Sequence, residues 1–536
     1  MTLGEKITHL RNVAGMSQEV LSDKLSVSRQ AVSKWEMDQA QPQIDKILLL
    51  CNLFGITADE LLKDDIFIDR TPRTNKYFGT DGFRGEANLN LTSIQAYKVG
   101  RFLGWYYSSP LSGHHNKGRK PRIVIGKDTR RSSYMLEYSI VAGITASGAD
   151  AYMLHVTTTP SVSYVTRQDG FDCGIMITAS HNPFYDNGIK IINRQGEKLD
   201  DETTALIEAY IDGNLKAIGI KEDDLPLAKK ENIGCIVDYV SGRNRYVGYL
   251  ISVASNSYKN LHIGLDCANG ASWTIAKAVF DALGAKTVII GDEPDGLNVN
   301  LGCGSTHIEK LCELVKSQKL DVGFAFDGDA DRCIAVDENG NVVDGDGMMY
   351  VLANRLKSKG MLNGNTVVAT VMSNSGFFAS LQKIGIDCEQ TKVGDRFVYE
   401  AMQNKDFALG GEQSGHIILK KYATTGDGIL TAIMIAEEMC DRKKSLSKLV
   451  ENLMLYPQHV VNVRVKDKSA VIGDNEVAKA LAKVEAQIDG NGRALLRQSG
   501  TEPVIRIMIE SESPELCEKY ADTIANVIKE RGHCFE

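Results

Sequence analysis

The sequence changes its periodicity once, near residue 76, and this change restricts the possible folds more than any other feature. Residues 1–64 show helical patterns and no run in which apolar and polar side chains alternate. Later, short β-branched runs begin at Arg122, His262 and Val367, and each is followed by a polar loop and a helical pattern. Strands that alternate with helices favour sheets covered by helices. The sequence therefore predicts an all-α head followed by serial α/β units.

Length and composition indicate a globular protein of several domains. At roughly 100–200 residues per domain, a chain of 536 residues suggests three or four domains. Hydrophobic residues make up 43% and charged residues 24%, which excludes a wholly disordered or collagen-like chain. The net charge of −8 argues against a protein whose main task is to coat nucleic acid or an anionic membrane. Local groups must therefore hold any anionic ligand.

Cysteine usage and hydropathy predict a cytoplasmic protein. The 11 cysteines are scattered from Cys51 to Cys534 without a C-x-x-C pair, so neither a disulfide framework nor a zinc site is expected. The N-terminus lacks a signal-peptide pattern. Apolar runs such as Ile47–Cys51 are far shorter than the roughly 20 residues of a membrane span. We therefore expect no membrane partner.

The head carries a helix-turn-helix pattern. Its expected helices are Gly4–Ala14, Ser17–Leu25, Ser28–Glu36, Ile44–Phe54 and Ala58–Leu62. Ser17 and Ser28 stand at N-cap positions, and a short turn containing Val27 joins the second helix to the third. The run SQEVLSDKLSVSRQAVSKWE resembles the Cro/C1-repressor (XRE-type) DNA-binding domain. This resemblance implies a recognition helix that opens at Ser28.

The same resemblance implies DNA contacts in the head. The implied contacts are a phosphate contact at Gln18 and groove-facing side chains at Arg29, Gln30, Ser33 and Lys34. The charge of residues 1–64 is unfavourable, because seven Lys and Arg oppose nine Asp and Glu. A helical bundle used for dimerisation or for docking other proteins remains the alternative, and a homodimer is left open.

Two polar loops provide a candidate nucleophile and a candidate metal site. TASHNP, Thr178–Pro183, follows the apolar strand CGIMI, so Ser180 is placed to meet a ligand. In FDGDADR, Asp327, Asp329 and Asp331 alternate with small residues and can converge on one hard cation. An EF-hand is excluded, because Arg332 occupies its glycine position and the flanking runs are strand-like. Mg²⁺ shared with a phosphate fits best.

Two further loops have the chemistry to bind a sugar phosphate. In GEQSGH, Glu412, Ser414 and His416 can bracket sugar hydroxyls. RQSGTEPVIR is interpreted as a loop that forms a phosphate cradle; its candidate residues are Arg497, Ser499, Gly500 and Thr501. Each motif considered alone also fits an ordinary polar turn. Neither a Walker loop nor a G-x-G-x-x-G motif is present, so the proposed phosphoryl donor is Ser180 itself.

Taken in order, YFGTDGFRG, TASHNP, FDGDADR, GEQSGH and RQSGTEP resemble the α-D-phosphohexomutase superfamily across Lys76–Glu536. This resemblance implies an α/β protein with three mixed α/β domains and a C-terminal α+β domain. The expected divisions are the head at 1–64, a linker at 65–75, and mutase domains at 76–234, 235–335, 336–453 and 454–536. Those four domains would carry the phosphoserine, metal, sugar and phosphate loops, respectively.

The superfamily resemblance also implies a role for each site residue. Ser180 would be a phosphoserine that binds Mg²⁺ together with Asp327, Asp329 and Asp331. Arg84, His181, Lys190 and His416 would surround the reacting groups. Substrate contacts are implied for Arg332, Glu412, Ser414, Arg497, Ser499, Gly500, Thr501 and Arg506. The phosphoserine would convert the sugar phosphate into a hexosamine 1,6-bisphosphate and then recover the other phosphate.

The substrate expected from this resemblance is an amino sugar. The runs CGSTH and TKVGDRFV are closest to the superfamily members that interconvert glucosamine 6-phosphate and glucosamine 1-phosphate, which supply cell-wall precursors. A phosphomannomutase or phosphoglucomutase is the alternative within the superfamily. A transcription regulator that uses a retired mutase fold to sense sugar phosphates is the alternative outside it.

Overall fold

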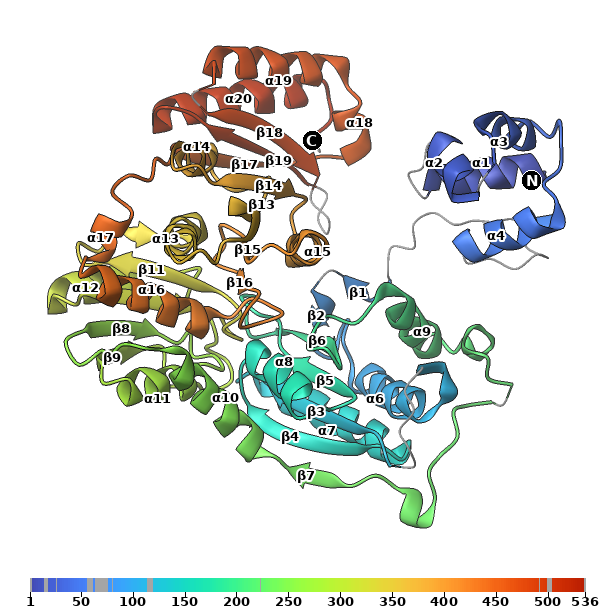
Figure 1. The fold of residues 1–536 in the computed structure, drawn as a ribbon, viewed down its shortest axis with the longest axis horizontal. Coiled ribbons are helices and arrows are strands. Elements are labelled where there is room, and N and C mark those ends of the chain that lie inside the picture. Colours follow the sequence, from blue (N-terminus) through green and yellow to red (C-terminus); the bar gives the residue numbers. More distant parts are fainter. Residues whose placement is uncertain are drawn as a thin grey trace. The chain divides into compact units, whose positions relative to one another are not determined.

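The computed structural model describes most of the chain, which divides into two compact units, Met1–Gly79 and Thr80–Glu536 (Figure 1). The described residues are 2–13, 18–25, 27–54, 61–62, 76–79, 81–112, 119–221, 223–490, 492–498 and 504–534. The linker expected at 65–75 lies outside them. Within them, no helix combines the length and apolar character needed to cross a membrane.

Four of the five short helices that the sequence predicts for the head are present, and of the fifth, Ala58–Leu62, only residues 61–62 are among the described residues. The helices are α1 (Leu3–Val13), α2 (Gln18–Leu25), α3 (Arg29–Glu36) and α4 (Ile44–Phe54). Ser28 caps α3 by accepting a hydrogen bond from the Ala31 N–H, whereas the cap expected at Ser17 lies outside the described residues. Val32 and Trp35 of α3 are buried against a small core, and Val27 packs on that core from the turn before α3.

The first α/β layer is a mixed seven-stranded sheet in the order β1-β2-β6-β5-β3-β4-β7. Its strands are β1 (Phe78–Gly79), β2 (Gly82–Glu86), β3 (Arg122–Lys127), β4 (Asp150–Val156), β5 (Cys173–Ile177), β6 (Asp186–Asn193) and β7 (Ile236–Asp238). Its helices are α6 (Ser93–Ser108), α7 (Arg131–Ala146), α8 (Thr159–Gln168) and α9 (Asp201–Ile211). β3 and β5 are parallel neighbours, so the loops that follow them meet at one edge of the sheet.

The second layer is a five-stranded sheet in the order β12-β11-β10-β8-β9. Its strands are β8 (His262–Asp266), β9 (Lys286–Ile290), β10 (Val322–Phe326), β11 (Cys333–Asp337) and β12 (Val342–Val343). Its helices are α10 (Val240–Val253), α11 (Ile275–Ala282) and α12 (Glu309–Gln318). β10 and β11 form an antiparallel hairpin around the acidic loop, so the strand-like flanks predicted for FDGDADR are confirmed.

The third layer is a four-stranded sheet in the order β14-β13-β15-β16. Its strands are β13 (Thr366–Thr370), β14 (Asp387–Thr391), β15 (Leu409–Gly411) and β16 (Ile417–Leu419). Its helices are α13 (Gly345–Ser358), α14 (Ser375–Lys383), α15 (Asp395–Lys405), α16 (Gly428–Arg442) and α17 (Leu446–Leu449). Phe324 of β10 and Leu356 of α13 belong to one hydrophobic core, which therefore extends from the second layer into the third.

The C-terminal part is a three-stranded antiparallel sheet in the order β17-β19-β18, with α19 and α20 packed on it (Figure 1). Its elements are β17 (Gln458–Arg464), α18 (Lys468–Ile472), α19 (Asn475–Ile488), β18 (Arg493–Gln498), β19 (Val504–Glu510) and α20 (Pro514–Glu530). The sequence placed Arg497 in a loop, and this was wrong. Ala494, Leu495 and Leu496 extend a strand through Arg497, which pairs with Arg506 of β19.

Candidate active site

Ser180 lies directly after β5 and reaches the acidic loop of the second layer. Its side chain is buried, and its Oγ donates a hydrogen bond to Asp327. Its N–H donates to Thr178 Oγ1 at 2.9 Å, and its Oγ lies 3.4 Å from His181 Nδ1. Ser180 has a φ of 52°, a conformation that is strained for a residue other than glycine and that is concentrated at functional sites.

Two buried side chains donate hydrogen bonds to the backbone of the serine loop. Arg130 donates from Nη2 to the carbonyl oxygens of Ser180 and Asn182, at 2.8 and 2.9 Å, and Asp128 holds its Nε at 2.7 Å. Asn300 also donates to the Ser180 carbonyl, at 2.9 Å. Sequence reasoning missed both Arg130 and Asn300. Arg130 ends the run RIVIGKDTR, and its place after a strand was the signal that could have found it; Asn300 had no comparable signal.

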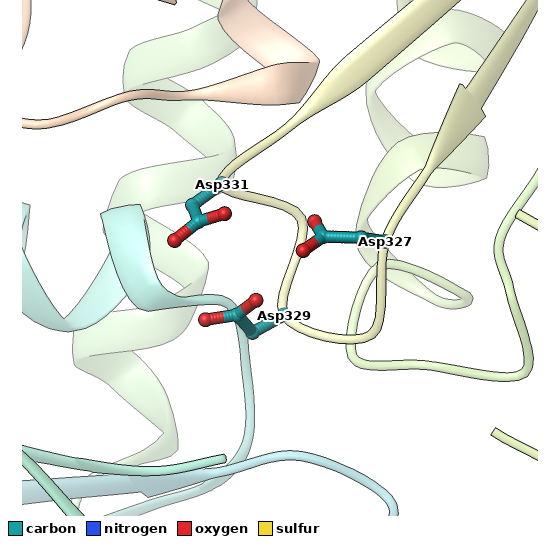
Figure 2. A group of neighbouring side chains, drawn as sticks. All are labelled: Asp327, Asp329 and Asp331. Carbon is teal, nitrogen blue, oxygen red and sulfur yellow. The ribbon is translucent and has the colours of Figure 1, made fainter. Parts of the chain in front are cut away.

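The three aspartates of the acidic loop converge, as Figure 2 shows. Asp327, Asp329 and Asp331 are buried, and one carboxylate oxygen from each lies within 4.8 Å of the others. The Oδ1 atoms of Asp329 and Asp331 are buried without a hydrogen-bond partner in the described part of the chain. Hard cations prefer oxygen ligands of this kind, so the residues present fit Mg²⁺. Burial, together with the charges of Asp331 and Asp329, raises the pKa of Asp327.

Lys190 balances part of this negative charge. Its Nζ lies 2.6 Å from Asp329 Oδ2 and 2.9 Å from Asp331 Oδ2. Burial alone would lower the pKa of Lys190, but the two carboxylates outweigh burial and raise it. Lys190 is therefore a fixed cation beside the acidic loop.

Two histidines flank the acidic loop in opposite electrostatic settings. Burial, followed by the charges of Arg332 and Arg84, lowers the pKa of His181 to about 4, so its imidazole is neutral at pH 7. His416 is buried, and its Nε2 accepts the Gly426 N–H at 3.0 Å. Burial would lower the pKa of His416, but Asp331, 3.7 Å from its Nδ1, contributes to raising it.

Both arginines expected here lie at the site. Arg84 Nη1 is 3.5 Å from Asn182 Oδ1 in the serine loop. The backbone N–H of Arg332 donates to Asp327 Oδ1 at 3.2 Å. Burial would lower the pKa of Arg332, but the carboxylates of Asp331 and Asp327 raise it, so its guanidinium is a permanent positive charge.

The GEQSGH turn between β15 and β16 packs against the β10–β11 hairpin that carries the acidic loop. The Cys333 N–H of β11 donates to the Gly415 carbonyl at 3.0 Å. Gly415 has a φ of 91°, and a Cβ there would lie 2.1 Å from the Cys333 carbonyl oxygen, so only glycine fits. Glu412 Oε1 accepts the Gly394 N–H at 3.1 Å, and Ser414 is exposed. The candidate sugar loop is thereby fixed beside the candidate metal loop.

Arg497 and Arg506 lie opposite each other on β18 and β19 and line a cavity of about 310 Å³. Burial, and then the charge of Arg506, lowers the pKa of Arg497. Two neighbouring guanidinium groups suit an anionic ligand such as phosphate. The cavity wall includes Val393, which precedes the Gly394 that binds Glu412. Ser499, Gly500 and Thr501 lie outside the described residues.

The predicted DNA contacts of the head are only partly exposed. Arg29, Gln30 and Lys34 of α3 are exposed, whereas Ser33 is half-buried. Gln18, predicted to contact phosphate, is half-buried and donates from Nε2 to Glu36 at 2.7 Å.

Family models match both parts of the chain. Four describe phosphoglucomutase/phosphomannomutase: domain I at residues 75–217, domain II at 244–340, domain III at 344–456 and the C-terminal domain at 460–527. The chain belongs to the phosphoglucomutase/phosphomannomutase family. It is therefore an isomerase of the phosphohexomutase type. A separate helix-turn-helix family model matches the head at residues 9–61.

Curated relatives of this phosphohexomutase include two bacterial phosphoglucosamine mutases. The protein from Lachnospira eligens is 58% identical over 458 residues, covering 85% of this chain and 99% of that protein. The protein from Brevibacillus brevis is 46% identical over 456 residues, with coverages of 85% and 99%. This similarity extends over nearly the whole of both relatives and over 85% of this chain.

Solved structures share the fold of this phosphohexomutase at low identity. A phosphoglucomutase/phosphomannomutase family protein from Burkholderia thailandensis has a TM-score of 0.68 at 21% identity, covering 86% of this chain and 98% of that one. An Aspergillus fumigatus N-acetylphosphoglucosamine mutase, solved with GlcNAc-6P and magnesium, has a TM-score of 0.59 at 18% identity, with coverages of 85% and 96%. Both establish the architecture of the mutase part.

Proposed function

We propose that residues 76–536 interconvert glucosamine 6-phosphate and glucosamine 1-phosphate. The observation that carries this proposal is the 58% identity to a phosphoglucosamine mutase over 458 residues. The site supports it, because a buried serine, an acidic triad and fixed cations supply a nucleophile, a metal site and charge for phosphoryl transfer.

Ser180 would carry the phosphoryl group. In the forward step the Oγ–P bond breaks while a bond forms from phosphorus to a hydroxyl oxygen of the sugar phosphate. That hydroxyl loses its proton and Ser180 Oγ takes one up, which gives a hexosamine 1,6-bisphosphate and the free serine. In the return step the other O–P bond of the bisphosphate breaks, Ser180 Oγ takes that phosphoryl group and releases its proton, and the freed sugar oxygen takes up a proton. Asp327, which accepts the Ser180 hydroxyl, and His181 Nδ1 at 3.4 Å are both within reach of the Ser180 proton.

Mg²⁺ would be held by Asp327, Asp329, Asp331 and the phosphoserine. When bound, this ion would supply positive charge to the oxygens of the transferring phosphoryl group. Lys190 would orient Asp329 and Asp331 through its two short contacts. Glu412 and Ser414 would bind sugar hydroxyls, and the cradle formed by Arg497, Ser499, Gly500, Thr501 and Arg506 would bind the phosphate that does not react.

We also propose the domain division at 76–234, 235–335, 336–453 and 454–536, after a head at 1–64 and a linker at 65–75. The four matched segments support it, since each corresponds to one of these domains. We place the enzyme in the cytoplasm, and its free cysteines support a reducing compartment.

A coupled assay that compares glucosamine, glucose and mannose 6-phosphates tests the substrate. We expect kcat/KM to be highest for glucosamine 6-phosphate, because the sequence similarity is to enzymes named for that sugar. The assay should contain Mg²⁺ and a sugar bisphosphate primer so that Ser180 is charged. Faster turnover of the mannose or glucose phosphate would replace our assignment with a phosphomannomutase or phosphoglucomutase.

We propose that the head binds duplex DNA through α3, a second function favoured by its exposed Arg29, Gln30 and Lys34. Selection from a random duplex library at low salt should enrich one sequence. The double variant Arg29→Ala, Gln30→Ala should lose this enrichment while its mutase kcat stays unchanged. No enrichment by the unmodified chain would leave the head as a dimerisation or docking module.

A further inference from the structure

Lys198 joins two carboxylates that come from distant parts of the sequence. It follows the turn after β6, and its Nζ lies 2.6 Å from Asp395 Oδ1 and 3.5 Å from Asp81 Oδ1. Asp81 precedes β2, and Asp395 is the first residue of α15. Lys198 thus connects the sheet that carries the serine loop to the layer that carries the sugar loop.

The second oxygen of each carboxylate faces a residue of the active site. Asp81 Oδ2 lies 3.4 Å from Arg84 Nη2, and Asp395 Oδ2 lies 3.5 Å from His416 Nε2. Because a carboxylate is rigid, a cation at one oxygen restrains the group that faces the other. Lys198 therefore restrains Arg84 through Asp81, and through Asp395 it positions the carboxylate that faces His416, whose Nε2 itself accepts the Gly426 N–H.

We propose that Lys198 is a positioning residue for phosphoryl transfer, an inference that rests on the function proposed above. Its single positive charge offsets part of the negative charge of Asp81 and Asp395, which would otherwise repel an anionic substrate more strongly. It also fixes, through Asp81, the direction in which Arg84 approaches the reacting groups, and it holds the Asp395 carboxylate beside His416. Loss of such alignment lowers the rate of the chemical step even when substrate still binds.

A second ion pair between the same two layers, formed by Arg396, provides a matched control for this proposal. Lys198, Asp395 and Arg396 line one cavity of about 340 Å³. Arg396 of α15 forms an ion pair at 2.5 Å with Asp201 of α9 in the other layer, and one at 2.8 Å with Glu400 of its own helix. Those carboxylates are 59% and 50% exposed, so they are surface groups. Replacing Arg396 removes one ion pair between the two layers. It leaves intact the contacts of Lys198 with Asp81 and Asp395, which face Arg84 and His416.

The kinetic test compares Lys198→Met, Lys198→Arg and Arg396→Met in the Mg²⁺-loaded, bisphosphate-primed enzyme. Lys198→Met should lower kcat by about 10–100-fold with little change in KM. Lys198→Arg should recover most of the loss, because it restores the positive charge. Arg396→Met should retain a kcat within about twofold of the parent, as expected for a surface ion pair. An unchanged kcat in Lys198→Met, or an equal loss in Arg396→Met, would overturn the proposal.

Amide hydrogen exchange provides a readout that does not depend on turnover. In Lys198→Met, amides of residues 81–86 and of Gly394, which donates to Glu412, should exchange faster than in the parent. In Arg396→Met the amides of residues 81–86 should be unaffected. If the unmodified protein shows no mutase activity, the proposed function fails, and unchanged exchange in Lys198→Met separately refutes the positioning role.

Discussion

Replacing Ser180 with alanine should abolish mutase turnover, with a loss in kcat of about 10⁴–10⁶-fold. The variant lacks the oxygen that would carry the phosphoryl group, and nothing else at the site replaces it. Alanine preserves the loop, because the contacts that hold it are donated by Arg130 and Asn300 to backbone carbonyl oxygens. The coupled assay measures turnover, and intact mass after incubation with sugar bisphosphate measures phosphorylation: the parent should gain one phosphoryl group and the variant none.

Ser139→Ala is the matched control for this loss. Ser139 lies in α7, where its Oγ donates to the Met135 carbonyl within the same helix. This variant should keep both turnover and phosphorylation. Ser180→Ala should also keep any DNA binding by the head, which would establish two separable functions. If the unmodified protein neither turns over nor takes up a phosphoryl group, the regulator that senses sugar phosphates becomes the better explanation.

Replacing Asp329 with asparagine should lower kcat by about 10³-fold or more and remove the response to added Mg²⁺. The buried Oδ1 of Asp329 has no hydrogen-bond partner in the described structure, and Oδ2 accepts from Lys190 and Thr159. Asparagine keeps the shape but removes the charge that a hard cation requires. Activity should be measured across a range of Mg²⁺ concentrations, and calorimetry with Mg²⁺ alone should show binding to the parent only.

Chelation of Mg²⁺ should reproduce this loss in the parent, and adding Mg²⁺ back should reverse it. Asp281→Asn provides the control, because Asp281 belongs to the same layer but pairs with Lys277 on the surface at 2.5 Å. This variant should respond to Mg²⁺ like the parent. Full activity of the parent in excess chelator would contradict the assignment of the acidic triad.

Features encoded in short stretches of sequence could be predicted from the sequence. The strands around the acidic loop follow from their apolar runs, and the convergence of Asp327, Asp329 and Asp331 follows from their alternation in one tight loop. The cap at Ser28 also follows from local pattern. In each case the deciding interactions join residues only a few positions apart.

Features that depend on how layers pack could not be predicted in this way. Arg130 and Ser180 meet because β3 and β5 are neighbours, which no local pattern reveals. Lys198 and Asp395 are 197 positions apart and meet only after two layers have packed. Arg497 was misplaced for a related reason, since its strand is defined by pairing with β19.

The contact between Gly415 and Cys333 has a consequence for how the specificity of this enzyme could change. The hydrogen bond between their backbones, with no room for a Cβ, ties the GEQSGH turn and the β10–β11 hairpin into one rigid template. An insertion in either loop would displace both the residues proposed to bind the sugar and those proposed to bind Mg²⁺. We therefore expect a shift toward another sugar to come from side-chain replacement at the positions proposed to contact it, such as Glu412 and Ser414, while the length of both loops stays constant.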